Sequence, residues 1–216
     1  MMLLRPPGVY RAQGDTWLLA DCFQRLPRLA GARVLDLGTG TGALAVTAAL
    51  RGATVTAVDV SSLALAATWI NARCRSLRVR VRRGDLGAPV AGERFDIVLC
   101  NPPYVPGEGA TLPRRGRCRA WDAGLDGRAL LDRVCTEVPR LLAPGGQLLL
   151  VQSAFCGVDR TLDALTAAGL AAEVVHRCVQ PFGPVLRLRA ALLEARGLIR
   201  PGQRDEELVV IRGSTQ

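Results

Sequence analysis

Four consecutive residues, Asn101-Pro102-Pro103-Tyr104, are suited to holding a planar amino group. They follow an apolar run, Phe95–Cys100, that we expect to be a β-strand. The two prolines restrict the backbone to extended conformations and remove two N–H donors, which leaves the local carbonyls as acceptors. The Asn101 side-chain carbonyl and the Pro102 carbonyl can each accept one proton of an –NH2 group, while the Tyr104 ring stacks on its face. We therefore predict that Asn101, Pro102 and Tyr104 are catalytic and orient a weak nitrogen nucleophile.

A glycine-rich turn, Asp36-Leu37-Gly38-Thr39-Gly40-Thr41-Gly42, follows the first apolar run, Arg33–Leu37. Glycine has no Cβ and adopts positive φ easily, so such a turn lets the backbone approach a ligand closely. In open α/β sheets, nucleotides bind at this edge, where the strands end. The Gly-x-Gly-x-Gly spacing argues against a dinucleotide, and the absence of a following Gly-Lys-Ser/Thr excludes a phosphate loop. We expect Asp36, Gly38, Gly40 and Gly42 to contact a cofactor.

Acidic residues follow the next two apolar runs. Asp59 ends the run Thr54–Asp59, where its carboxylate can accept both hydroxyl protons of a ribose. Asp85 follows the third run, where it can accept a hydrogen bond from an adenine amino group while Leu86 packs on the ring. Recognition of a nucleoside without a pyrophosphate indicates S-adenosylmethionine, with the glycine-rich turn and its preceding aspartate facing the methionine part.

Short runs rich in Val, Ile and Leu alternate with longer segments of helical periodicity, which predicts an α/β fold with helices on both faces of a largely parallel sheet. The 216 residues favour one domain, 1–216. The expected strands are Arg33–Leu37, Thr54–Asp59, Arg78–Arg82, Phe95–Cys100, Gly146–Val151, Glu173–Val179 and Glu207–Arg212. The expected helices are Gly42–Arg51, Ser61–Arg73 with Ser61 or Ser62 as its cap, Gly124–Leu142, Val158–Ala168 and Pro184–Gly197.

The net charge of +9 comes from 28 basic and 19 acidic residues, and every basic residue is arginine. The absence of lysine excludes a Schiff-base lysine and a phosphate-loop lysine. Because there is a single histidine, His176, on a late expected strand, we expect no strong general base. Seven cysteines without a Cys-x-x-Cys pair indicate neither disulfides nor a metal site. The sequence shows no secretory signal or membrane span, so we expect a cytoplasmic protein without a membrane partner.

Two arginine-rich segments bear on possible partners. In Arg78-Val79-Arg80-Val81-Arg82-Arg83 the alternation gives one charged face, which favours an edge strand guarded by positive charge. The second segment, Arg114–Arg119, lies in a Gly/Pro-rich loop after the fourth strand. Long loops are disproportionately functional, so this segment is either a substrate contact or a solvated loop.

The placed motifs together resemble the class I methyltransferases of the HemK type, which methylate a glutamine side-chain amide in translation release factors. The similarity rests on Val34–Gly42, Asp59, Asp85 and Asn101–Tyr104 and covers roughly residues 9–155. Tyr10 with Asp15-Thr16-Trp17-Leu18-Leu19 is similar to a segment that helps close the cofactor pocket in the short subfamily. Trp121–Gly127 resembles the Trp-acid-Gly-Gly-x-Asp-Gly stretch, with Ala123 in place of a glycine.

This resemblance implies a Rossmann-like seven-stranded sheet with the last strand antiparallel, S-adenosylmethionine as donor, and a Gly-Gly-Gln loop as acceptor. It places Thr16 and Asn101 at the cofactor and residues 1–30 as a segment that closes its pocket. Only about thirty residues precede the first strand, so the chain is similar to the compact branch without the helical N-terminal domain. Enzymes of that branch are often steadied by a small zinc-binding activator beside the third strand. Here that strand carries arginines, so we expect independence unless such a partner is acidic.

Three other functions remain open at this point. Adenine N6-methyltransferases share the Asn-Pro-Pro-Tyr logic because an exocyclic amine presents the same planar –NH2. Aromatic residues make up only 4% of the chain, and none lies inside either arginine segment, which disfavours a nucleic-acid partner. A small-molecule N-methyltransferase is compatible with the same acceptors. A non-catalytic S-adenosylmethionine-binding protein would not need Asn101 through Tyr104.

Overall fold

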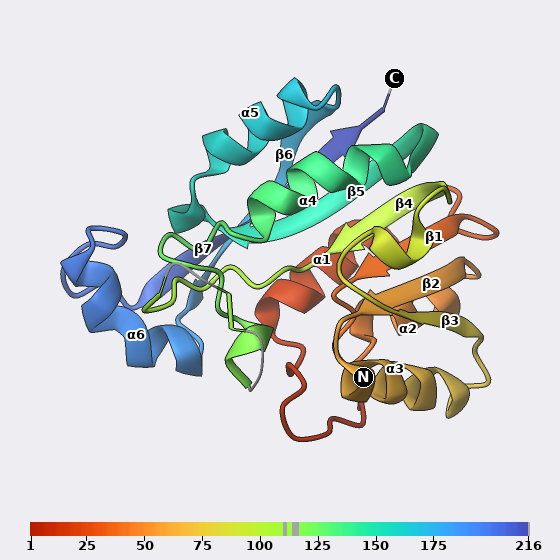
Figure 1. Ribbon diagram of the computed structural model, residues 1–216, viewed down its shortest axis with the longest axis horizontal. Coiled ribbons are helices and arrows are strands. Elements are labelled where there is room, and N and C mark those ends of the chain that lie inside the picture. The colour runs from red at the N-terminus through yellow and green to blue at the C-terminus, as the bar shows by residue number, and fades with distance from the viewer. Residues whose placement is uncertain (110–111, 114–116, 216) are drawn as a thin grey trace.

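A twisted sheet with helices on both faces forms the centre of the computed structural model, which describes residues 1–109, 112–113 and 117–215, without the side chains of Arg117 and Arg119 (Figure 1). Within these residues the strand order is β3-β2-β1-β4-β5-β7-β6. The strands are β1 (Arg33–Leu37), β2 (Thr54–Asp59), β3 (Val79–Arg83), β4 (Phe95–Cys100), β5 (Leu142–Ser153), β6 (Ala171–Pro181) and β7 (Asp205–Ser214). Pairing from β3 through β5 is parallel, and β7 runs antiparallel to both β5 and β6. The expected seven-stranded sheet with an antiparallel last strand is confirmed.

Six α-helices lie in the described residues: α1 (Gly14–Gln24), α2 (Ala43–Leu50), α3 (Ser62–Arg73), α4 (Leu131–Glu137), α5 (Val158–Ala167) and α6 (Pro184–Ala195). Short 3-10 turns span Ala88–Val90, Arg117–Ala120, Val138–Leu141 and Ala154–Cys156. Helices α4 and α5 cover one face of the sheet, α1 to α3 cover the other, and α6 lies at the end that carries β6 and β7 (Figure 1). In the described part of the chain, no helix is long and apolar enough to cross a membrane.

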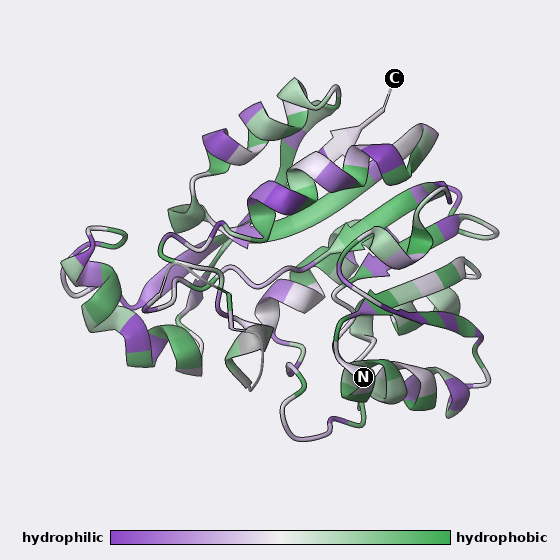
Figure 2. Ribbon diagram, viewed as in Figure 1, coloured by the Kyte–Doolittle hydropathy of each residue, from purple (hydrophilic) through white to green (hydrophobic). Residues whose placement is uncertain are grey.

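The sheet buries apolar side chains on both faces, as a parallel sheet sandwiched between helices must. In β1, Leu35 and Leu37 join the cluster under α4 and α5, while Val34 joins the cluster under α1 and α2. The central parts of β4 (residues 97–100) and β5 (residues 148–151) are apolar (Figure 2). The rigid centre of the sheet therefore fixes where the strand ends project.

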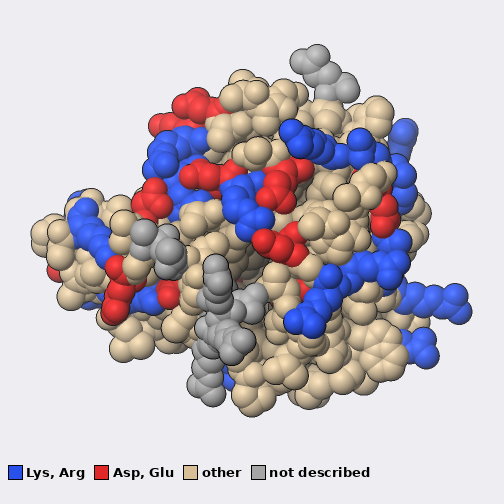
Figure 3. Space-filling model, viewed as in Figure 1, with Lys and Arg blue, Asp and Glu red and all other residues tan. Residues whose placement is uncertain are grey.

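Strand β3 lies at the edge of the sheet, as its alternating arginines predict. Its residues are half-buried or exposed in alternation, and Arg80 pairs with Glu93. Basic side chains gather toward the side of the molecule that carries β3, whereas elsewhere on this face acidic and basic side chains are interspersed (Figure 3). The positive charge is therefore distributed and forms no single stripe on this face.

Two helical assignments differ from the sequence expectation. The helix expected over Gly124–Leu142 is wrong, because α4 begins only at Leu131 and gives way to a 3-10 turn at Val138. Gly124 and Gly127 adopt φ of +79° and +77°, which an α-helix does not allow. Helix α1, by contrast, lies in a segment for which no helix was expected. The cap of α3 is confirmed, because Ser61 Oγ accepts a hydrogen bond from Ala64 N at 3.3 Å.

Candidate active site

A cavity of about 520 Å³ opens at the edge of the sheet where the parallel strands end. This volume is in the range of small-molecule and cofactor sites. Its walls come from the N-terminal segment, the ends of β1 to β4, the residues after β4, and the facing ends of β6 and β7. Of the residues expected at the site, those that line the cavity are Thr16, Gly38, Gly40, Asp59, Asp85, Leu86, Asn101, Pro102 and Tyr104.

The glycine-rich turn forms the cavity wall after β1. Gly38 and Gly40 adopt φ of +70° and +55°, and a Cβ on Gly38 would meet no atom within 4 Å. The N–H groups of Gly38 and Thr39 donate to the Val58 carbonyl at 2.9 and 3.1 Å, which fixes the turn against β2. The backbone is therefore held rigidly and left open to a ligand, as the sequence pattern predicts.

Asp36 and Gly42 lie behind this turn and do not line the cavity. Asp36 Oδ2 accepts hydrogen bonds from Thr39 Oγ1 at 2.6 Å and from Ala45 N at 3.0 Å. Burial raises the pKa of the Asp36 carboxyl to about 7, and its Oδ1 has no hydrogen-bond partner among the described residues. Gly42 is required for packing, because a Cβ there would lie 2.8 Å from Thr68 Cγ2. Contact of either residue with a cofactor stays a prediction.

The acidic strand ends occupy the same side of the cavity. Asp59 ties the glycine-rich turn to the start of α3, since its Oδ2 accepts from Gly40 N at 3.0 Å and its Oδ1 from Ser61 N at 2.8 Å. Asp85 is exposed and forms an ion pair with Arg133 of α4, with 3.0 Å between Oδ2 and Nη2. Leu86, half-buried beside it with φ +44°, is the apolar surface available to a base.

Asn101 is oriented by a chain of hydrogen bonds that begins at α1. Its Nδ2 donates to Thr16 Oγ1 at 3.1 Å, and that hydroxyl donates to Asp15 Oδ1 at 3.2 Å. Because Asp15 accepts at the end of this chain, the amide nitrogen of Asn101 must face Thr16. The Asn101 carbonyl oxygen is thereby left as an acceptor.

Tyr104 is fixed by the same carboxylate. Its hydroxyl donates to Asp15 Oδ2 at 3.1 Å, and the Tyr10 hydroxyl donates to the same oxygen at 2.9 Å. Gln13 completes the group by donating to the Tyr10 hydroxyl at 3.0 Å. Burial and the neighbouring Asp15 charge raise the pKa of Tyr104 far above its usual value, so the phenol stays a donor. One buried carboxylate therefore positions the two side chains of the loop after β4 that are predicted to be catalytic, Asn101 and Tyr104.

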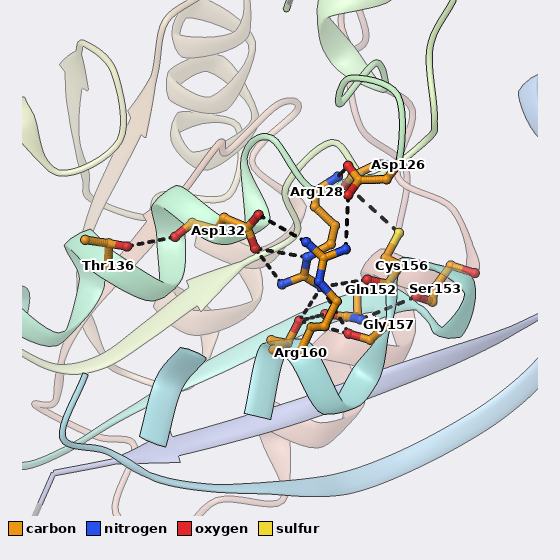
Figure 4. Close-up of polar contacts among 11 residues, drawn as sticks. Asp126, Arg128, Asp132, Thr136, Gln152, Ser153, Cys156, Gly157 and Arg160 are labelled. Atoms are coloured by element: carbon orange, nitrogen blue, oxygen red, sulfur yellow. Dashed lines mark hydrogen bonds and ion pairs between the residues drawn. The ribbon is translucent and has the colours of Figure 1, made fainter. Parts of the chain in front are cut away.

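The backbone of the same loop rests on a second network, built around Arg128 (Figure 4). The guanidinium, with Arg128 only 1% exposed, donates to the carbonyls of Cys156 and Gly157 and pairs with Asp132. The Cys156 thiol in turn donates to the Tyr104 carbonyl at 3.3 Å. A buried guanidinium that donates to two main-chain carbonyls and a carboxylate is a rigid support, so the position of Tyr104 is determined from both its side chain and its backbone.

Substitution of Gly127 by alanine is expected to disturb this support. A Cβ at Gly127, whose φ is +77°, would overlap the Tyr104 carbonyl oxygen and approach Cys156 Sγ to 3.0 Å. We expect Gly127→Ala to lower the free energy of unfolding by more than about 2 kcal/mol and to reduce turnover, because strain from a positive φ and a backbone clash add. Denaturant unfolding and turnover assays check this.

Gly169→Ala is the matched control for Gly127→Ala. Gly169 also has positive φ, +87°, but a Cβ there meets nothing within 4 Å. It should lower the free energy of unfolding by only about 1 kcal/mol and leave turnover unchanged. Equal effects of the two substitutions would show that the contact with Tyr104 is unimportant.

Helix α6 clamps the segment that follows Tyr104. Arg189 donates to the Pro106 carbonyl at 2.7 Å and pairs with Asp122. Arg196 donates to the Gly107 carbonyl at 2.7 Å. The arginine segment expected as a possible substrate contact, Arg114–Arg119, lies largely outside the described residues. Helix α6 thus holds the chain on both sides of this segment, at Pro106 and Gly107 before it and at Asp122 after it.

Sequence reasoning did not assign roles to several residues that line the cavity: Gln13, Asp15, Trp121, Gln180 and Glu206. Asp15 belonged to the motif resemblance but was not expected to orient Asn101 and Tyr104. Gln180 and Glu206 come from β6 and β7, about 80 and 105 residues after Asn101 by number. No local pattern marks them, because they enter the site only through the pairing of these two strands.

Comparison with known proteins identifies the family. The chain matches the methyltransferase small domain family over residues 2–114. It is 31% identical over 185 residues to a putative protein N5-glutamine methyltransferase of Methanocaldococcus jannaschii, covering 85% of this chain and 92% of that protein. A release factor glutamine methyltransferase of Gloeobacter violaceus is 44% identical over 130 residues, covering 56% of this chain and 46% of that protein. The chain thus spans about half the length of this bacterial relative.

A solved structure shows the same fold. The E. cuniculi Mtq2-Trm112 complex, described as responsible for methylation of the eRF1 translation termination factor, superposes with a TM-score of 0.65 at 23% identity. The match covers 97% of this chain and 99% of that chain.

The residues that line the cavity are suited to binding S-adenosylmethionine. The open backbone at Gly38 admits a ligand, and Asp59 and Leu86 line the same side. Behind the turn lies a buried Asp36 oxygen that has no hydrogen-bond partner among the described residues. The chain therefore belongs to the methyltransferase small domain family and is an S-adenosylmethionine-dependent methyltransferase of class I fold.

Proposed function

We propose that this enzyme methylates the side-chain amide nitrogen of a glutamine in a translation release factor, within a Gly-Gly-Gln loop. The observation that carries the proposal is the fixed orientation of Asn101, whose Nδ2 is committed to Thr16 at 3.1 Å. Its carbonyl oxygen is then a preorganised acceptor for one proton of an –NH2 group. The relatives named as glutamine methyltransferases support the same acceptor.

The residues after β4 act by orientation and electrostatics. S-adenosylmethionine, when bound, supplies an electrophilic methyl group. The Asn101 and Pro102 carbonyls hold the two amide protons, and the Tyr104 ring, 6% exposed, packs on the amide face. These acceptors favour the positive charge that develops on nitrogen as it attacks. As the N–C bond forms, the sulfonium S–C bond breaks. The surplus proton on nitrogen then leaves to solvent at the open cavity, because His176 on β6 does not line it.

The cofactor side is assigned to the ends of β1, β2 and β3. We propose that Gly38 and Gly40, with Asp36 behind them, hold the methionine part, and that Asp59 holds the ribose. Asp85 and Leu86 take the adenine, while Thr16 and Asn101 border the cofactor. Gly42 packs closely against Thr68 of α3 behind the turn. Residues 1–30 close the pocket within a single domain of residues 1–216, a role supported by Pro7 to Tyr10 in the cavity wall.

The proposed acceptor, a glutamine of a release factor, implies both a protein partner and a location for the enzyme. A release factor substrate works in the cytoplasm, where we place the enzyme. Mtq2 is solved as a complex with Trm112, which supports a small activator for this chain too. The exposed arginines of β3 would then require an acidic partner surface at that edge. Because these arginines oppose a partner strand at that edge, we favour an enzyme that acts without an activator.

One experiment tests the acceptor directly. Labelled S-adenosylmethionine is offered with purified release factor, total RNA and total DNA in parallel, and modified products are mapped by mass spectrometry. Methyl label on the glutamine of the Gly-Gly-Gln peptide is expected. Label on RNA or DNA but not on this peptide would replace the proposal with an adenine N6-methyltransferase. Label on neither, with turnover of small amines or amides, would replace it with a small-molecule enzyme.

A further inference from the structure

Glu206, the second residue of β7, carries a buried carboxyl oxygen that nothing in the described protein satisfies. The residue is 3% exposed and lines the cavity. Its Oε1 accepts a hydrogen bond from Gln180 Nε2 at 3.0 Å, whereas its Oε2 has no partner among the described residues. The Ser153 hydroxyl lies near this carboxyl and lowers its pKa as a hydrogen-bond donor, although neither Ser153 Oγ nor Glu206 Oε2 has a partner of normal geometry among the described residues. A buried carboxyl oxygen without a partner is destabilising unless a ligand completes it.

The sheet topology places this oxygen on the acceptor side of the cavity. Because β7 runs antiparallel to β5, its first residues lie at the edge where β4 and β5 end. From Asn101, at the end of β4, the strands β1, β2 and β3 extend in one direction, and β5, β7 and β6 extend in the other. The glycine-rich turn, Asp59 and Asp85 all belong to the first direction. Glu206 belongs to the second, away from the nucleoside.

The free oxygen is held in a fixed direction. Gln180 lies opposite Glu206 in the β6–β7 pairing and packs over Gly14, where an added Cβ would overlap its side-chain oxygen. This packing leaves the Gln180 amide nitrogen directed at Glu206 Oε1. Because Oε1 is thereby occupied, Oε2 is the oxygen of this cavity-lining residue that is left without a partner among the described residues.

The charges around Glu206 favour a ligand that donates hydrogen bonds. The ionisable groups that influence it or are influenced by it are Asp15 from α1, Tyr10 from the N-terminal segment, Tyr104 after β4 and Cys156 after β5. None of these carries a positive charge. Burial raises the pKa of Glu206 to about 7, opposed by the hydrogen bonds from Gln180 and Ser153 and aided by the Asp15 charge. A donor N–H would therefore meet an acceptor that no cation in the described part of the chain neutralises.

We propose that Glu206 determines acceptor specificity by accepting, at Oε2, a hydrogen bond from a main-chain N–H of the acceptor peptide beside the methylated glutamine. This inference rests on the proposed function, because it takes a peptide as the ligand. Peptide N–H groups are regularly spaced donors, and the glycines of a Gly-Gly-Gln loop leave theirs unhindered by side chains. Asn101 would then hold the reacting amide, and Glu206 would hold the chain that carries it.

The test uses the full-length enzyme, S-adenosylmethionine, and a synthetic Gly-Gly-Gln peptide alongside intact release factor. Glu206→Gln keeps the size of the side chain and removes its charge. We expect it to raise KM for the peptide about tenfold, with little change in kcat or in Kd for S-adenosylmethionine, because a hydrogen bond to a charged group is lost. Glu206→Asp, which keeps the charge but retracts it, should raise KM by a smaller factor.

The matched control is Glu207→Gln. Glu207 is the next residue of β7, pairs with Arg177 at 2.8 Å and does not line the cavity, so all three constants should remain those of the wild type. Wild-type kcat/KM for the peptide should rise from about pH 6 to about pH 8 as Glu206 ionises, and Glu206→Gln should lose this rise. If the carboxyl had a purely structural role, Glu206→Gln would change the melting temperature but neither KM nor the pH profile.

The outcomes separate the two proposals. A wild type that methylates the peptide while Glu206→Gln retains its KM overturns the role of Glu206 and leaves the proposed function intact. An equal loss of affinity for S-adenosylmethionine also overturns it, because the carboxyl would then serve the cofactor or the fold. A wild type that methylates no glutamine in peptide or protein overturns both.

Discussion

Asn101→Ala is expected to reduce kcat by about 100-fold or more while changing Kd for S-adenosylmethionine by less than about threefold, because the lost group orients the nucleophile. The substitution removes the carbonyl acceptor that Thr16 and Asp15 hold in place. Without this acceptor, the amide nitrogen of the substrate glutamine can rotate away from the transferred methyl group. Single-turnover measurements with labelled cofactor report kcat, and titration calorimetry reports cofactor affinity.

Thr16→Val separates orientation from direct contact. Valine matches the shape of threonine but lacks the hydroxyl that accepts from Asn101 Nδ2. The Asn101 carbonyl would then be present but free to turn. The kcat of Thr16→Val should therefore lie between that of the wild type and that of Asn101→Ala. A large loss of cofactor affinity in Asn101→Ala would show instead that this side chain serves mainly the cofactor. Unchanged turnover would place the acceptor site elsewhere in the cavity.

The strands could be predicted because each has a local signal, whereas their antiparallel end followed from the family resemblance. Runs of Val, Ile and Leu identified the strand centres, and the alternating arginines identified β3 as the edge. The pattern of apolar residues did not identify a helix where polar residues are buried. Helix α1 buries Asp15 and Thr16 in its first turn together with Leu19 and Phe23, so its buried face does not show an apolar period. The third expected helix failed because positive φ at Gly124 and Gly127 turns the chain before Leu131.

The candidate site could be predicted only in the part that depends on parallel strands. Their carboxyl ends share one edge, so Asp59, Asp85 and Asn101 were expected together, and the structure brings them to one cavity. The other part depends on long-range pairing. Glu206 reaches the cavity because β7 reverses direction, and Asp15 reaches Tyr104 because α1 packs across the sheet. A single sequence does not specify such partners, since each residue is locally an ordinary acidic side chain.

Asp59→Ala is expected to weaken the binding of S-adenosylmethionine and to leave kcat nearly unchanged, which is the reverse of the result expected for Asn101→Ala. The Asp59 carboxylate lies at the end of β2, in the cavity wall, and accepts from Gly40 N at 3.0 Å and Ser61 N at 2.8 Å. Its loss removes the predicted ribose acceptor and also loosens the glycine-rich turn. With each hydrogen bond to a charged group contributing about 1.5–3 kcal/mol, Kd for S-adenosylmethionine should rise by about 100-fold or more. At saturating cofactor, kcat should remain near that of the wild type, because the loop after β4 is untouched.

S-adenosylhomocysteine sharpens this prediction, because it has the same ribose but lacks the transferred methyl group and its charge. If Asp59 binds the ribose, calorimetry should show the same fold loss of affinity for both molecules. A loss confined to S-adenosylmethionine would indicate that the carboxylate acts on the positive sulfonium instead. Asp96→Ala is the control, since Asp96 pairs with Arg33 on an exposed surface of β1 and β4. Removing that pair should change the free energy of unfolding by less than about 1 kcal/mol and leave both affinities unchanged. A ribose contact therefore requires that Asp59→Ala weakens both ligands equally while Asp96→Ala weakens neither.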